Sequence, residues 1–161
     1  MTRAHPAHPA RDPALAALLA RVAVVDTLTT LFVATDERDW QAVRELFTPE
    51  VYFDMTSLAG GEPTTHTPAE IAGAWERGLA PIEHVHHQVG NFHVQLDGAE
   101  ADASCYGIAY HYRRHPSGRN TRVFVGTYAF RLREEEERWR VCSFRFQVKF
   151  VEGNQTLEQD A

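Results

Sequence analysis

The spacing of apolar residues is helical in the first half of the chain. Apolar side chains recur every three or four positions through residues 13–36, directly after Asp12, whose side chain suits a helix N-cap. A second, shorter run of this kind covers residues 40–47 and ends at Thr48-Pro49. A third run covers residues 67–79 and begins with the capping-box sequence Thr67-Pro68-Ala69-Glu70. The pattern therefore predicts three helices.

In the second half, apolar residues alternate with polar ones, which is typical of strands that bury one face. Three turn sequences separate the runs: Asp97-Gly98, residues 115–118 and the charged tip Glu134–Glu137. Residues 51–55 predict one further strand, and the Gly- and Pro-rich stretch 57–63 predicts a loop. The four main strands are expected at residues 85–96, 101–115, 121–133 and 138–151. We expect an α+β fold in which helices cover one face of a curved, mainly antiparallel sheet and leave a pocket.

Length and composition fit one globular domain. The chain has 161 residues, of which 43% are apolar and 24% are charged, and such a chain can bury one substantial core. The first residues repeat His-Pro-Ala, and the last ones are polar and acidic. We therefore expect a flexible leader at residues 1–11, a single domain at 12–151 and a flexible acidic tail at 152–161.

Charge and apolar content argue against several kinds of partner. The formal net charge is -6 and no basic stripe exists, so we expect no nucleic-acid partner. No uninterrupted run of about 18 apolar residues occurs and the leader lacks the apolar part of a secretory signal, so we expect no membrane partner and a cytoplasmic location. Cys105 and Cys142 lie far apart without the spacing of metal ligands, which predicts free thiols.

The segment from His84 to Phe92 carries the most chemistry. In a strand, His87 shares one face with Val85, Val89 and Asn91, whereas His84 and His86 lie on the other face. A histidine on an apolar face is either a hydrogen-bonded core residue or a proton-transfer group. Three imidazoles on two faces cannot share one ion without strain, so we expect no metal site.

Two further residues could join His87. His111 shares its strand face with Ala103, Cys105, Gly107 and Ala109, whose small side chains would leave space above the strand. Asp36, at the end of the first helix, is either a surface turn former or a carboxylate partner for a histidine. A carboxylate that fixes the tautomer of an imidazole would allow proton transfer without a metal or an organic cofactor, and no phosphate-binding glycine loop is present.

The chain resembles the cone-shaped α+β superfamily of nuclear transport factor two, and within it the SnoaL-like branch that includes scytalone dehydratase. The resemblance covers roughly residues 14–150. It rests on the order and spacing of three segments: Thr35-Asp36-Glu37-Arg38-Asp39-Trp40, Phe47-Thr48-Pro49-Glu50-Val51 and His87-Gln88-Val89-Gly90-Asn91. It implies a cone-shaped α+β barrel with three N-terminal helices on a strongly curved sheet that encloses a pocket.

The resemblance also implies roles for residues. The catalytic aspartate and two histidines of scytalone dehydratase fall on Asp36, His87 and His111. The assisting serine and asparagine fall instead on Gly126 and Tyr128, and two substrate-facing tyrosines fall on Thr35 and Met55. The polar contacts to substrate therefore differ from those of that enzyme.

The expected activity is cofactor-independent acid/base chemistry of a dehydratase, isomerase or cyclase type, on a small hydrophobic, oxygenated molecule. The residues expected to bind it are Phe53, Met55, Trp75, Asn91 and Tyr128. Arg145 and Lys149 are either the polar side of the last strand or contacts for an acidic group. The alternative is a non-catalytic binding or dimerisation module, because a fold does not determine a function. We expect a homodimer or homotrimer.

Overall fold

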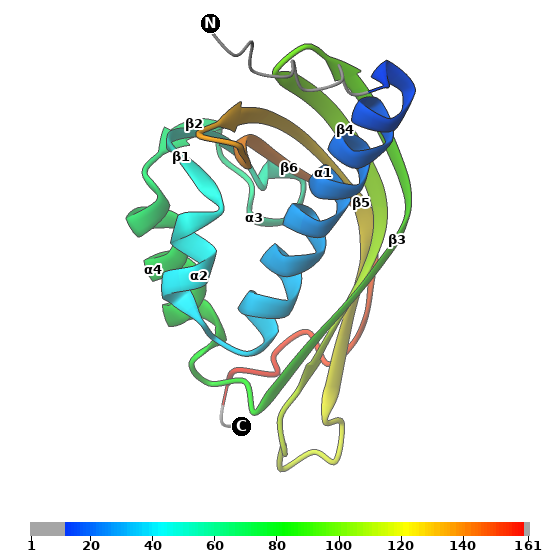
Figure 1. Cartoon of the computed structure of the whole chain (residues 1–161). Helices are drawn as coiled ribbons and strands as arrows, with labels where there is room; N and C mark the ends of the chain where they lie inside the picture. The colour runs from blue at the N-terminus through cyan, green and yellow to red at the C-terminus, as the bar shows by residue number, and fades with distance from the viewer. Residues whose placement is uncertain (1–11, 160–161) are drawn as a thin grey trace, which may run out of the picture.

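A six-stranded sheet, curved around one long helix, forms the body of the protein (Figure 1). The computed structural model describes residues 12–159, so the leader predicted at 1–11 lies outside the described residues. The strand order is β2-β1-β6-β5-β4-β3. The elements are α1 (Pro13–Asp36), α2 (Trp40–Glu45), β1 (Phe47–Asp54), α3 (Thr56–Ala59), β2 (Thr64–His66), α4 (Pro68–Leu79), β3 (His84–Asp97), β4 (Glu100–Tyr112), β5 (Thr121–Glu135) and β6 (Arg138–Gly153).

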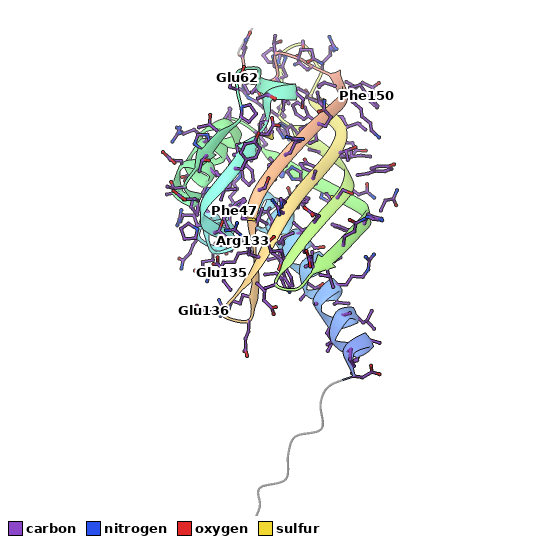
Figure 2. The ribbon with its side chains drawn as sticks, turned by 90° about the horizontal axis from the view of Figure 1, so that it is seen from above. Phe47, Glu62, Arg133, Glu135, Glu136 and Phe150 are labelled. Atoms are coloured by element: carbon purple, nitrogen blue, oxygen red, sulfur yellow. The ribbon has the colours of Figure 1, made fainter. Side chains whose placement is uncertain are left out.

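The antiparallel meander β3-β4-β5-β6 confirms the four predicted strands. The turn between β3 and β4 contains Gly98 with φ 57°, and the turn between β5 and β6 contains Glu136 and Glu137 with φ 51° and 61°. Positive φ at these positions matches the twist of a hairpin. Figure 2 shows Glu135 and Glu136 at this hairpin tip, at the far end of the strands from Phe150.

Helix α1 supplies the helical side of the core and lies across the concave face of the sheet (Figure 1). Its residues Val24, Leu28, Leu31 and Phe32 are buried against the sheet. By length and composition α1 would be long and apolar enough to cross a membrane. The second half of α1 nevertheless belongs to the domain core, from Val24 to Ala34, whereas apolar residues of its first half such as Leu18 are exposed.

The two shorter predicted helices are present, with one change of boundary. The α4 capping box is complete, as the sequence predicted. The N–H of Glu70 donates to the hydroxyl oxygen of Thr67, and the N–H of Thr67 donates to the carboxylate of Glu70. Helix α2, in contrast, ends at Glu45, and Phe47 already belongs to β1. The chain becomes extended here because the N–H of Val141 in β6 donates to the carbonyl oxygen of Leu46 (2.8 Å). Strand β1 then runs parallel to β6.

The structure differs from two other expectations. Within the stretch 57–63, predicted as a loop, residues 57–59 belong to the short helix α3, whereas residues 60–63 form a loop that leads into the edge strand β2. The tail predicted to be flexible at 152–161 is packed against the domain as far as it is described, to residue 159. Leu157 is fully buried with Leu79, Ile82 and Val85, so its apolar side chain anchors the segment.

Candidate functional site

A cavity of about 270 Å³ lies between the helices and the inner face of the sheet. Its walls are mainly apolar and aromatic, with few polar groups, which is the usual character of a small-molecule site. The polar side chains that line it include His87, His111, Arg122 and Glu158. The remaining lining residues are Phe32, Thr35, Met55, Leu58, Ala74, Trp75, Gly78, Leu79, Ala109, Phe124, Tyr128, Phe144 and Phe146.

Asp36 and His87 form a closely bonded pair at this cavity. One oxygen of Asp36 lies 2.6 Å from Nδ1 of His87, and the other accepts the backbone N–H of His87 at 2.8 Å. Because a carboxylate only accepts, Nδ1 carries the hydrogen and Nε2 of the ring is left as an acceptor. The side chains are only 12% (His87) and 15% (Asp36) exposed.

Local structure brings this pair together. Asp36 is the last residue of α1, and the chain turns directly after it, where Arg38 has φ 60°. The Arg38 guanidinium donates to the carbonyl oxygen of Ile82, just before β3. This bond joins the end of α1 to the start of the strand that carries His87.

His111 lies on β4 and is the second imidazole in the cavity wall. Burial and the adjacent Arg122 guanidinium lower the pKa of His111 from 6.5 to about 4, so its ring is neutral at pH 7. A terminal nitrogen of Arg122 lies 3.5 Å from His111 Nδ1. Since an arginine only donates, Nδ1 of His111 accepts and Nε2 carries the hydrogen. The two histidines therefore have opposite tautomers.

Arg122 and Glu158 are cavity residues that sequence analysis missed. Arg122 pairs with His111 across β4 and β5, and it forms a two-pronged ion pair with Glu158. Glu158 belongs to the segment predicted to be a loose tail. The one available signal was Leu157, an apolar residue beside Glu158 in an otherwise polar stretch.

A family comparison agrees with this arrangement. Residues 16–145 match the SnoaL-like domain. The chain belongs to this family. No curated protein sequence matches it.

Solved structures show the same fold as this SnoaL-like chain. The Kfla4162 protein of Kribbella flavida superposes with a TM-score of 0.83 at 18% identity, covering 88% of this chain and 98% of the other. A scytalone dehydratase-like protein of Novosphingobium aromaticivorans gives 0.76 at 13% identity, covering 89% and 93%. The hexachlorocyclohexane dehydrochlorinase LinA-type3 of Novosphingobium barchaimii gives 0.72 at 10% identity, covering 89% and 95%. At these identities the likeness establishes the cone-shaped α+β fold.

Three of the five predicted substrate-binding residues line the cavity of this SnoaL-like domain: Met55, Trp75 and Tyr128. Phe53 lies behind the wall, with its ring stacked 5.1 Å from that of Phe144. Asn91 is exposed, because a bulge in β3 between Gly90 and His93 places it at φ 57° and changes the alternation of the strand. Asn91 therefore does not line this cavity.

The small residues on the face of β4 do not simply leave empty space. A side chain at Gly107 would overlap the ring of Tyr128, so the glycine makes room for that tyrosine. Burial raises the pKa of Tyr128 well above its usual range, so its hydroxyl keeps its proton. The cavity therefore lies nearer His111, beyond the part of the strand that Tyr128 fills.

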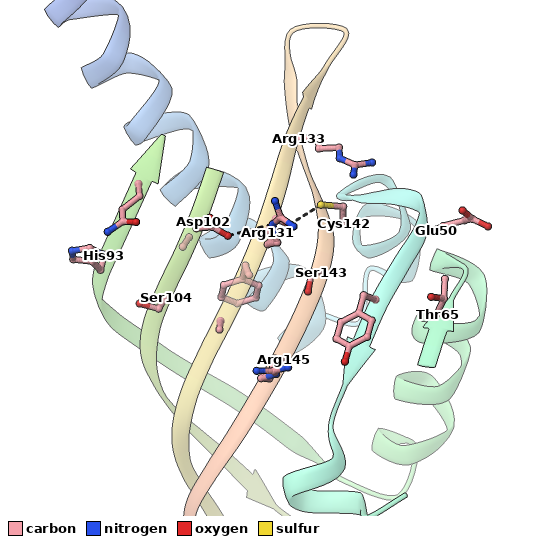
Figure 3. A pocket seen from close by; sticks show the side chains of 15 residues that line it. Glu50, Thr65, His93, Asp102, Ser104, Arg131, Arg133, Cys142, Ser143 and Arg145 are labelled. Carbon is pink, nitrogen blue, oxygen red and sulfur yellow. Dashed lines mark hydrogen bonds and ion pairs between the residues drawn. The ribbon is translucent and has the colours of Figure 1, made fainter. Parts of the chain in front are cut away.

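A wider depression of about 810 Å³ lies on the opposite face of the sheet (Figure 3). Two of its arginines form ion pairs: Arg131 with Asp102, and Arg145 with Asp54 at 2.8 Å. Arg145 is therefore on the outer side of the last strand, away from the cavity. Within residues 12–159, no group of three His, Cys, Asp or Glu side chains is arranged to hold a metal ion.

Proposed function

We propose that the protein is a cofactor-independent enzyme that transfers protons on a small hydrophobic, oxygenated molecule held in the cavity. The observation that carries the proposal is the Asp36–His87 pair at an apolar cavity. An imidazole with a carboxylate on one nitrogen and a free acceptor on the other is suited to act as a general base. Catalysis of this kind by a positioned side chain is worth about 10²–10⁴-fold in rate.

The two histidines divide the chemistry. His87 takes a proton from carbon through Nε2, and Asp36 stabilises the imidazolium that forms. His111, neutral and with its hydrogen on Nε2, donates a hydrogen bond to an oxygen of the substrate. If that oxygen leaves as hydroxide, the reaction is a dehydration: the C–H electron pair becomes the new C=C bond, the C–O pair leaves with the oxygen, and the proton that His87 took up passes to it to form water.

Two structural neighbours support an elimination as the reaction type. One is scytalone dehydratase-like and the other is named a dehydrochlorinase. An isomerase or cyclase would begin with the same proton abstraction. The cavity of about 270 Å³ favours a molecule of one or two rings, because it is at the small end of the usual range for ligand pockets.

The test is exchange of an acidic C–H proton in a bicyclic ketone, 2-tetralone, followed by proton NMR in D₂O. We expect the protein to accelerate deuterium uptake, and His87→Gln or Asp36→Asn to lower the rate by at least about 10²-fold. His86→Gln is the matched control, because His86 is the neighbouring imidazole, 73% exposed and 3.9 Å from Asp36. A folded His87→Gln protein with the rate of the parent would exclude His87 as the base and favour a non-catalytic binding module.

A further inference from the structure

Arg122 is a buried cation in a cavity that is otherwise largely apolar. Its side chain is 12% exposed, and its guanidinium lies 4.9 Å above the ring of Phe124. The Nε nitrogen is buried and has no hydrogen-bond partner within the described part of the chain. Its terminal nitrogens contact Glu158 and, at 3.5 Å, His111. A buried guanidinium at the wall of an apolar cavity, beside an imidazole that can donate a hydrogen bond, is a binding group for an anion.

Glu158 lies at the rim and accepts from the two terminal nitrogens of Arg122. Its side chain is 32% exposed, far more than that of Arg122, and it comes from the last turn of the described chain. Although burial acts to raise the pKa of Glu158, its bonds to Arg122 lower that pKa overall, so the carboxylate stays charged. The cation is thus fixed in the wall, while its anion lies at the edge, where a ligand can replace it.

We propose that Arg122 binds the negative oxygen that forms on the substrate, and that Glu158 holds Arg122 in position until this oxygen displaces it. The proposal rests on the proposed function and names the substrate class: an enolisable carbonyl compound of one or two rings. When His87 takes a proton next to the carbonyl, the C–H electron pair forms a C=C bond. The C=O π pair moves to the oxygen, and Arg122 pairs with that enolate. No electron is gained from or lost to another reactant.

The probe is 4-nitrophenol, a planar mimic of the enolate whose phenolate form absorbs visible light. Titrated with wild-type protein, bound 4-nitrophenol should ionise about one pH unit lower than free 4-nitrophenol, since an adjacent opposite charge lowers a pKa by about 1–3. Arg122→Met should abolish this shift, and Arg122→Lys should keep part of it. Arg131→Met is the matched control, because Arg131 lies on the outer face of the sheet.

Glu158→Gln separates this role from a structural one. If Glu158 competes with the ligand for Arg122, the neutral variant binds the phenolate several-fold more tightly. If the ion pair only builds the wall, the variant binds it equally or more weakly, and that result overturns the proposal. Absence of saturable phenolate binding by the wild type, or an unchanged shift in a folded Arg122→Met protein, also overturns it.

The test of the anion site is independent of the test of the proposed proton transfer. Asp36→Asn, which impairs the base, should keep the phenolate shift because Arg122 is intact. If Arg122→Met leaves the ionisation of bound 4-nitrophenol unchanged while His87→Gln still slows 2-tetralone exchange, the anion site alone is refuted. If Arg122→Met abolishes the shift but His87→Gln does not slow the exchange, His87 is refuted as the base and the anion site stands.

Discussion

His111 should make the protein less stable in mild acid, by an amount that the structure specifies. In the unfolded chain a histidine is protonated below its ordinary pKa of 6.5, whereas in the folded protein burial and Arg122 keep His111 neutral down to about 4. Between these two values the unfolded state binds more protons, so the free energy of unfolding falls as the pH falls. Above pH 6.5 neither state binds this proton, and below about 4 both do.

The size of the effect follows from the same two values. At about 1.4 kcal/mol for each pH unit, lowering the pKa from 6.5 to about 4 corresponds to about 3 kcal/mol of stability. This is a large share of the roughly 5–15 kcal/mol that stabilises an ordinary domain. The other ionisable groups facing His111 are His87, which acts to lower the pKa of His111 further, and Glu158 and Asp36, which act to raise it.

His111→Gln isolates the contribution, because glutamine keeps a polar side chain but does not titrate. Urea unfolding followed by circular dichroism at several pH values from 7 to 4 gives the free energy of unfolding for both proteins. The wild type should lose about 3 kcal/mol more than the variant over this range. Parallel curves for the two proteins, or an NMR titration in which His111 protonates at its ordinary pH, would refute the argument.

Three substitutions, the first with a matched control, test the packing around the site by thermal unfolding. Gly107→Ala should destabilise the protein by about 1–3 kcal/mol because the new methyl group overlaps Tyr128, whereas Gly90→Ala, which meets nothing within 4 Å, should change little; equal effects would contradict this. Gly78→Ala should stabilise α4 by roughly 0.5–1 kcal/mol, because alanine favours a helix more than glycine does. Its methyl group should also narrow the cavity and weaken 4-nitrophenol binding, and unchanged binding would show that the ligand lies elsewhere. Leu157→Ala should cost at least about 2 kcal/mol, and a neutral result would mean that the last turn is not anchored.

The meander and the capped helices could be predicted from sequence because their signals are local. The Asp97-Gly98 turn and the Thr67–Glu70 capping box each lie within a few residues, and no distant partner is needed to interpret them. The start of β1 is different. Phe47 would suit the apolar side of a helix or of a strand, and only its pairing with Val141 decides between them.

The candidate site likewise contains residues that the sequence could place and residues that it could not. Alternation along β3 correctly placed His87 inside and His86 outside, but it failed at Asn91, where the bulge inserts residues into the pattern. The Arg122–Glu158 pair joins residues 36 positions apart, and Glu158 alone looks like any acid in a polar tail. The homodimer or homotrimer stays a prediction, since its evidence would lie between chains.

The contrast between His87 and His111 shows how neighbours give two identical side chains different chemistry. His87 faces a carboxylate, so its hydrogen lies on Nδ1 and its other nitrogen can accept a proton. His111 faces a guanidinium, so its Nδ1 accepts and its other nitrogen donates. A proton acceptor and a hydrogen-bond donor thus face one cavity. Exchanging those neighbours, more than exchanging the histidines themselves, should determine which end of a substrate loses the proton.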